Sequence, residues 1–187
     1  MAGDDRTSIH VLKLYEKLRQ TPYEFSLAQA FRRLECAHPD KKRIGESNSP
    51  QEDPVRFGQQ PSLAFAPSAL AAFEDGKPGF PPRLLVYCFG LFGPNGALPL
   101  HLTDYARERI FQHKDPTFSR FADVFHHRML SLLYRAWANA QPTVSYDRPE
   151  QDRFGDRVGT LMGIGSSVFQ ERDAMPDRLK LHFAGII

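Results

Sequence analysis

The chain contains little cysteine. Its 187 residues include only two, Cys36 and Cys88, and they do not have CxxC spacing. A disulfide framework or a cysteine-based zinc site needs more thiols than this, so the sequence excludes both. Each cysteine stands in an apolar context, and we expect two buried thiols in a protein of a reducing compartment.

Long apolar runs and blocks of like charge are also missing. No run approaches the roughly 20 apolar residues that span a bilayer, and the opening "MAGDDRTSIH" has no basic-then-apolar signal. The formal net charge is +2, from 24 basic and 22 acidic residues that are interspersed. Nucleic-acid domains usually concentrate basic residues, so the pattern argues against nucleic-acid binding as well as membrane insertion. We expect a cytoplasmic protein.

Phenylalanine and proline are abundant, with 15 residues of each. The clearest helix signal is "DPTFSRFADVFHHRMLSLLYRAWANAQP", where Asp115 is a cap, Pro116 suits the first turn and Pro142 stops the helix. This pattern predicts a helix over about 116–140. Its large apolar residues recur along one side: Phe118, Phe121, Phe125, Leu132 and Trp137.

A second helix is predicted in "TPYEFSLAQAFRRLECAH". Thr21 and Glu24 have the spacing of a capping box, with Pro22 between them. We expect Tyr23, Leu27, Phe31 and Leu34 to form its buried stripe and Glu35 to lie at its flank.

Strand signals are short. They occur at Val55–Phe57, in "SLAFAP" at 62–67 and in the apolar "LLVYCF" at 84–89. The polar, proline-rich segment 39–61 predicts a surface connection. Together these signals predict a helix-dominated α+β fold, in which a small irregular sheet packs on a long central helix between extended Pro/Gly-rich loops.

The loop "FGLFGPNG" raises the question of phosphate binding. Its glycines, at 90, 93 and 96, fit neither GxxxxGK[ST] nor GxGxxG, and Pro94 lacks the amide that a phosphate cradle would use. We predict a tight turn instead, in which Asn95 or Gly96 takes a positive φ.

Histidines support an alternative hypothesis, a metal-binding or hydrolytic module using His101, His113, Asp123 and His127. Asp123 and His127 are four residues apart on the long predicted helix and would share one face. No further ligands stand at a recognisable spacing, and no GxSxG elbow is present. The residues therefore favour a protein without catalysis, metal or cofactor.

Alternating acids and arginines follow the long helix, in "YDRPEQDRFGDR". Each arginine has a carboxylate nearby in the sequence, so local ion pairs are expected. Where such pairs become buried between chains they fix the register of an interface. Arg148, Asp152 and Arg153 are therefore candidate interface residues.

Several segments, in this order, closely resemble the TssG family, also called ImpH, of type VI secretion baseplates. They are "EDPVRFGQQPSLAFAPSAL", "FGLFGPNGALPLHLTDYARER", "DPTFSRFADVFHHRMLSLLYRAWANAQPTVSYDRPEQDRF" and "RDAMPDRLKLHFAG". The resemblance covers residues 21–187 and leaves 1–20 as an N-terminal arm or helix. Family members continue past "FAG", so the resemblance implies a missing C-terminal part, and the apolar end "FAGII" is expected to be covered.

The resemblance implies a structural role without catalytic residues. TssG-like proteins are wedge components that associate with two copies of TssF, and the wedge also carries TssK and TssE and surrounds the spike and hub. It further implies a location at the cytoplasmic face of the inner membrane. The candidate interface residues are Leu91, Phe92, Pro94, Asn95, Phe118, Phe121, Trp137, Arg148, Asp152 and Arg153.

Overall fold

The computed structural model describes residues 2–170, 172 and 174–183. The chain divides into two compact units, Met1–Ala136 and Trp137–Ile187. Helices dominate and three strands form a small mixed sheet, so the helix-dominated α+β fold predicted from the sequence is confirmed. Within the described part of the chain, no helix combines the length and apolarity that a bilayer crossing needs.

The sheet of the first unit contains β1 (Arg56–Gln59), β2 (Leu70–Glu74) and β3 (Arg83–Val86). Strand β3 is central; it runs parallel to β1 and antiparallel to β2. The apolar run at 84–89 therefore provides the central strand, as its continuous hydrophobicity predicts.

The strand predicted at 62–67 is wrong. Those residues form only bends and irregular structure, and the strand lies at β2, where Leu70 and Phe73 are buried. Pro67 has no amide to donate to a ladder, and Phe65 is 92% exposed. The segment thus lacks both the hydrogen bonds and the apolar cover that a strand needs.

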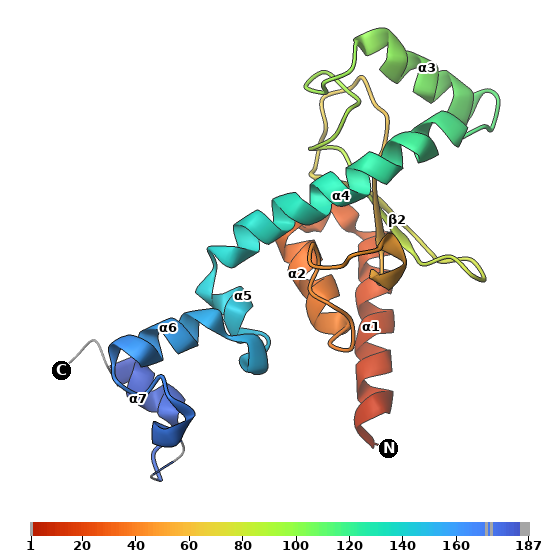
Figure 1. The fold of residues 1–187 in the computed structure, drawn as a ribbon. Helices are drawn as coiled ribbons and strands as arrows, with labels where there is room; N and C mark the ends of the chain where they lie inside the picture. Colours follow the sequence, from red (N-terminus) through yellow and green to blue (C-terminus); the bar gives the residue numbers. More distant parts are fainter. Residues whose placement is uncertain (1, 171, 173, 184–187) are drawn as a thin grey trace. The chain divides into compact units, whose positions relative to one another are not determined.

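Helices α1 (Ala2–Gln20) and α2 (Leu27–Ala37) pack on the sheet (Figure 1). The ring of Tyr15 on α1 lies 4.8 Å from that of Phe73. Phe31 of α2 stacks on Phe57 of β1 at a centroid distance of 4.1 Å. These aromatic contacts join the helices to the strands and form much of the core.

The capping box predicted at Thr21 does not begin a helix. Pro22–Glu24 form a 3₁₀ turn, and α2 begins after Ser26, whose side chain accepts a hydrogen bond from the amide of Gln29. Thr21 does meet Glu24, because its hydroxyl donates to Oε2 at 3.1 Å. Tyr23 lies in this 3₁₀ turn and is 64% exposed, so it is not part of the buried stripe that was predicted for the helix.

The predicted surface connection after α2 is exposed only in part: residues 39–42, 46, 48, 50 and 51 are exposed, and others are buried. Arg43, Ile44, Ser47 and Asp53 are all buried, and so is Glu35, which was expected at the flank of α2. The polar side of a long helix faces this segment and supplies the hydrogen-bonding partners that burial requires.

Helices α3 (Leu100–Phe111) and α4 (Thr117–Asn139) form a hairpin (Figure 1). Asp115 caps α4 by accepting from the amide of Thr117 at 3.0 Å, so the predicted long helix and its cap are confirmed. The turn between the helices contains Lys114 at φ 55°, a left-handed conformation that is costly for a residue with a Cβ.

The second unit contains short helices: α5 (Pro142–Tyr146), α6 (Arg153–Leu161) and α7 (Asp177–Phe183), with 3₁₀ turns at Pro149–Gln151 and Ser167–Phe169. The Asp152 carboxylate caps α6 by accepting from the amide of Gly155 at 3.0 Å. Residues 184–187, which hold most of the apolar end, lie outside the described residues.

The prediction of buried thiols is wrong, because Cys36 and Cys88 are both exposed. Cys36 follows Glu35, the last buried residue of α2, and lies on the side of the helix that faces away from the core. Cys88 lies just beyond the end of β3.

Candidate interaction surface

Helix α4 buries six polar side chains together with four apolar ones, and it exposes six large apolar side chains. Its buried polar residues are Ser119, Asp123, His126, His127, Ser131 and Arg135. Its exposed large apolar residues are Phe121, Val124, Phe125, Leu132, Leu133 and Trp137. An amphipathic helix of a self-contained protein normally buries its large apolar residues and exposes its polar ones, so the buried polar residues and the exposed apolar residues of α4 each require an explanation.

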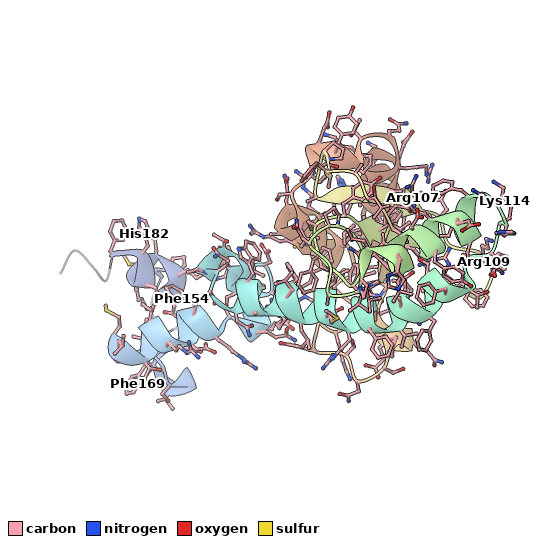
Figure 2. The ribbon with its side chains drawn as sticks, turned by 90° about the horizontal axis from the view of Figure 1, so that it is seen from above. Arg107, Arg109, Lys114, Phe154, Phe169 and His182 are labelled. Carbon is pink, nitrogen blue, oxygen red and sulfur yellow. The ribbon has the colours of Figure 1, made fainter. Side chains whose placement is uncertain are left out.

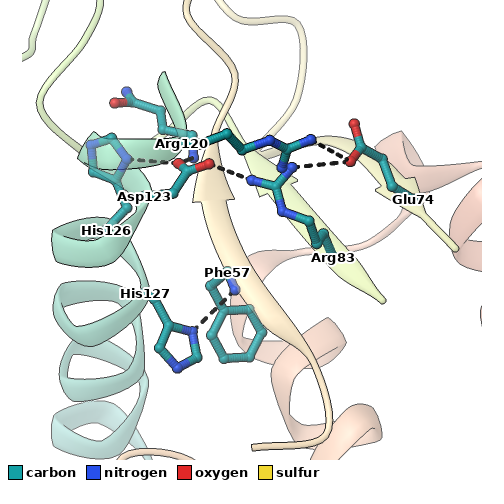
Figure 3. A network of polar contacts seen from close by, with 8 residues as sticks. Phe57, Glu74, Arg83, Arg120, Asp123, His126 and His127 are labelled. Atoms are coloured by element: carbon teal, nitrogen blue, oxygen red, sulfur yellow. Dashed lines mark hydrogen bonds and ion pairs between the residues drawn. The ribbon is translucent and has the colours of Figure 1, made fainter. Parts of the chain in front are cut away.

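The inner face of α4 closes the open edge of the sheet. Strand β1 is an edge strand, and its amides at 57 and 59 donate to α4 instead of to another strand. The Phe57 amide donates to Nδ1 of His127 at 3.1 Å, and the Gln59 amide donates to Oδ1 of Asp123 at 3.0 Å (Figure 3). Amides two residues apart on the strand thus meet side chains four residues apart on the helix. Because these amides are already bonded, the edge of the sheet is protected from pairing with another strand.

The bond from Phe57 fixes the tautomer of His127. An amide can only donate, so Nδ1 must accept and the proton must be on Nε2. Nε2 then donates to Oδ2 of the buried Asp53 at 2.9 Å, and this oxygen also accepts from the hydroxyl of Ser47 at the same distance. Both ring nitrogens of His127 are therefore used by the protein itself.

His126 is held in the opposite tautomer. The amide of Leu91 donates to its Nε2 at 3.0 Å, so Nδ1 carries the proton and donates to Oδ1 of Asp123 at 3.0 Å. The two adjacent histidines bind different segments, because His126 holds the glycine loop and His127 holds β1. His126 is fully buried and was not among the four residues of the metal hypothesis.

Asp123 also anchors a chain of ion pairs (Figure 3). Its Oδ2 pairs with Arg83 of β3, whose Nη1 reaches Glu74 of β2 at 3.1 Å. Glu74 accepts in addition from Arg120 of α4 at 3.3 Å. The network links the three elements through groups that are progressively more exposed, from Asp123 to Glu74.

A second buried cluster joins α4 to α2. Glu35 accepts from the amide of Ile44 at 2.9 Å and pairs with Arg135 and, at 3.4 Å, with Arg43. The Nε of Arg135 donates to the carbonyl of Ile44 at 2.8 Å. A buried ion cluster of this kind stabilises only when its hydrogen bonds are complete, and these bonds fix the segment after α2 against the helix.

Amides of the glycine loop are directed at the protein rather than outward. The Phe92 amide donates to Oε1 of Gln59, and the Phe92 carbonyl accepts from Nε2 of the same side chain, both at 2.8 Å. The amide of Gly93 donates to the hydroxyl of Thr103 at 3.0 Å. These amides, with that of Leu91, cannot also form an anion cradle in this conformation.

A tight turn is present at 93–96, where the Gly96 amide donates to the carbonyl of Gly93 at 3.0 Å. The positive φ of this turn was predicted at the wrong residue. The left-handed residue is Gly93, at φ 96°, rather than Asn95 or Gly96. Pro94 then occupies the first central position of the turn, where its fixed φ is suitable.

The outer face of α4 is apolar and uncovered. Phe121 is 63% exposed, Val124 65%, Phe125 50% and Leu132 46%. The rings of Phe121 and Phe125 pack edge to face at 5.6 Å. They cover each other in part, yet the face remains available to another molecule.

The candidate residues of the glycine loop and α4 differ in exposure. Phe92 is buried with Ala106 and Ala122, and Leu91 and Phe118 pack around this cluster. Pro94 and Asn95 are exposed at the tip of the turn, Phe121 is on the outer face, and Trp137 is 38% exposed. The structure therefore brings Leu91, Phe92 and Phe118 together in the interior, but not with Phe121.

The candidates of the second unit are Arg148, Asp152 and Arg153. Asp152 is the cap of α6, and Arg153, its first helical residue, is exposed. Arg148 is half-buried directly before a 3₁₀ turn. Their assignment to an interface stays a prediction.

Figure 2 labels three basic residues near the turn between α3 and α4: Arg107 and Arg109 on α3, and Lys114 in the turn itself. Arg109 pairs with Asp115, and this pairing raises the pKa of the guanidinium. The Thr117 hydroxyl, followed by Arg109, lowers the pKa of the Asp115 carboxyl. One of the three cations is thus committed to the helix cap.

The four residues of the metal hypothesis are not brought together. Asp123 and His127 bind the sheet edge, whereas His101 and His113 are exposed on and after α3, where His113 lies 3.8 Å from Glu108. Among the described residues, no group of three or more His, Cys, Asp or Glu side chains could hold a metal ion.

A family model described as "Type VI secretion, TssG" matches residues 21–187. The match begins directly after α1 and includes both faces of α4. Comparison with curated proteins and with solved structures gave no match.

Proposed function

The chain belongs to the TssG family of type VI secretion baseplate components, and we propose that it is a structural wedge subunit that binds TssF. In this proposal two copies of TssF bind the chain, TssK and TssE complete the wedge, and the assembly surrounds the spike and hub. We place it in the cytoplasm, at the cytoplasmic face of the inner membrane. Its role is to support assembly of the contractile tail.

The outer face of α4 is the observation that carries this proposal. Phe121, Val124, Phe125 and Leu132 expose apolar surface on the order of 400 Å², which is about the size of a functional patch on a soluble protein. Obligate interfaces commonly bury more than about 2,000 Å² in total, so this face would form the centre of a larger contact.

The inner face of α4 supports the same view. A surface that binds a partner must stay rigid without the partner, because ordering it on binding costs free energy. The bonds to β1, to the glycine loop and to Glu35 hold the inner face of α4. The helix is therefore fixed without contacts from its apolar outer face, which can bind a partner.

The test is co-expression of the full chain with affinity-tagged TssF. The proposal predicts that the two proteins are retained together and that the chain becomes more soluble and more resistant to protease than when it is expressed alone. Phe125→Ser should reduce retention, whereas Phe65→Ser, which changes another exposed phenylalanine outside α4, should not. A chain that is fully soluble alone and never retained by TssF would contradict the proposal.

A further inference from the structure

The outer face of α4 has the spacing of a helix-packing seam. Phe121, Phe125, Arg128 and Leu132 follow one another at intervals of four, three and four residues. Side chains at these intervals lie along one line of a helix and pack into the spaces of a second helix. The seam is about 17 Å long, which corresponds to about three turns of a partner helix.

Arg128 places a positive charge within this seam. Its Nη1 donates to the carbonyls of Gly45 and Ser47, at 3.5 Å and 3.4 Å, both near the limit for a hydrogen bond. No carboxylate of the described residues forms an ion pair with Arg128. A guanidinium carries five N–H donors, so most of its bonding capacity is left for an acceptor from outside the chain.

A second copy of this chain does not fit the face. The exposed charged residues of α4 are Arg120 and Arg128. Its one acidic residue, Asp123, is buried on the inner face of the helix. Pairing two such faces would bring further positive charge to a face that already carries two arginines and would supply no carboxylate. A self-association through α4 is therefore electrostatically unfavourable.

We infer that the outer face of α4 receives an amphipathic helix of a different protein, with apolar side chains along its seam and an Asp or Glu opposite Arg128. The inference rests on the proposed function, because TssF is the protein expected to supply this helix. Covering the seam removes water from the guanidinium, which is costly unless an acceptor replaces the water. A carboxylate matches the fork of the guanidinium and forms two parallel bonds with it.

The experiment measures the dissociation constant between the full chain and purified TssF for a set of charge variants. Arg128→Glu should weaken binding by about 100-fold or more, because it places a carboxylate next to the partner's carboxylate within the buried interface. Arg128→Met keeps an apolar stem and should weaken binding by about tenfold. Arg107→Glu changes an exposed arginine of α3 and is the matched control, with binding expected to stay within about threefold of wild type. The urea midpoints of all variants should match that of wild type, which separates binding from folding.

A photo-crosslinking residue at position 132 identifies the partner segment. The expected crosslinks fall on one TssF helix with apolar residues at the same four-three spacing and an acidic residue among them. Crosslinks to a second copy of this chain, or to an extended TssF segment, would overturn the inference. So would wild-type affinity in Arg128→Glu while the unmodified chain binds TssF. If the unmodified chain does not bind TssF at all, the proposed function fails and this inference fails with it.

Discussion

The amide of Phe57 donates a hydrogen bond of 3.1 Å to Nδ1 of His127, 70 residues later in the chain. This bond, with its neighbour from Gln59 to Asp123, places polar side chains of α4 at the open edge of the sheet. Hydrogen bonds and buried apolar side chains such as Tyr134 together hold the inner face of the helix to the fold. Its exposed apolar side chains lie on the outer face, outside this attachment.

Replacing His127 with alanine should destabilise the first unit by about 3 kcal/mol, because the Phe57 amide and the Asp53 carboxylate would both lose a partner in the interior. Urea unfolding gives the free energy. His113→Ala is the control, since its 3.8 Å contact with Glu108 is exposed and should contribute less than about 0.5 kcal/mol. Equal effects of the two substitutions would contradict the assigned role of His127.

Replacing Gly58 with alanine should displace the Asp123 carboxylate. A Cβ at position 58 would lie 2.7 Å from that carboxylate, which is closer than van der Waals contact allows. We expect a loss of about 1–3 kcal/mol, the usual range for overpacking. In an Asp123→Ala background the same substitution should cost much less, and a double-mutant cycle measures the difference. Strict additivity would show that the glycine is required for another reason.

The cap of α4 should weaken in acid. The Thr117 hydroxyl, and next the Arg109 guanidinium, hold the pKa of the Asp115 carboxyl below its ordinary value of about 4. A depressed folded-state pKa stabilises the protein above the unfolded-state pKa, and this contribution is lost as the pH falls through the folded-state value. Asp115→Asn should therefore lower the urea midpoint at pH 7 and lower it less at pH 3.

Asp104→Asn, which removes an exposed carboxylate from the middle of α3, is the control for this measurement. Its effect on the midpoint should be small at both pH values. A constant deficit of Asp115→Asn from pH 7 to pH 3 would be inconsistent with a stabilising ionised carboxylate.

Lys114→Gly should raise the thermal midpoint or leave it unchanged. Lys114 has φ 55°, a conformation that costs an L-residue about 1–2 kcal/mol and glycine nothing. Part of this gain is offset because glycine makes the unfolded chain more flexible, by about 0.4–1 kcal/mol. Lys114→Val should lower the midpoint, since a β-branched residue tolerates positive φ poorly. A destabilised glycine variant would mean that the lysine side chain itself stabilises the turn.

The sequence predicted the elements whose signals are local. The cap at Asp115 and the prolines at 116 and 142 bounded α4, and the apolar run after Arg83 identified the central strand. The resemblance of successive segments predicted the family, which the match over residues 21–187 confirms. Whether residues 1–20 form a separate arm stays a prediction.

Periodicity did not show which side of α4 faces inward. Apolar residues lie on both sides, with Leu130, Tyr134 and Ala138 buried and Phe121, Phe125 and Leu132 exposed. The choice depends on hydrogen-bonding partners from β1 and from the segment after α2, which are distant in the sequence. The one local sign was a group of polar residues, Asp123 with tandem histidines, in an otherwise apolar helix. A metal-ligand pair was only the disfavoured alternative for these residues, and nothing local in the sequence indicated that they bind a sheet edge.

The most direct test compares the Phe121→Ser/Phe125→Ser double variant with wild type in a titration against TssF, after urea unfolding of each protein alone. Both phenyl rings are at least half exposed, so the variant should be as stable as wild type, while its affinity for TssF should fall at least about 30-fold. Unchanged affinity in a normally folded variant would contradict the assignment of the outer face of α4 as the binding surface.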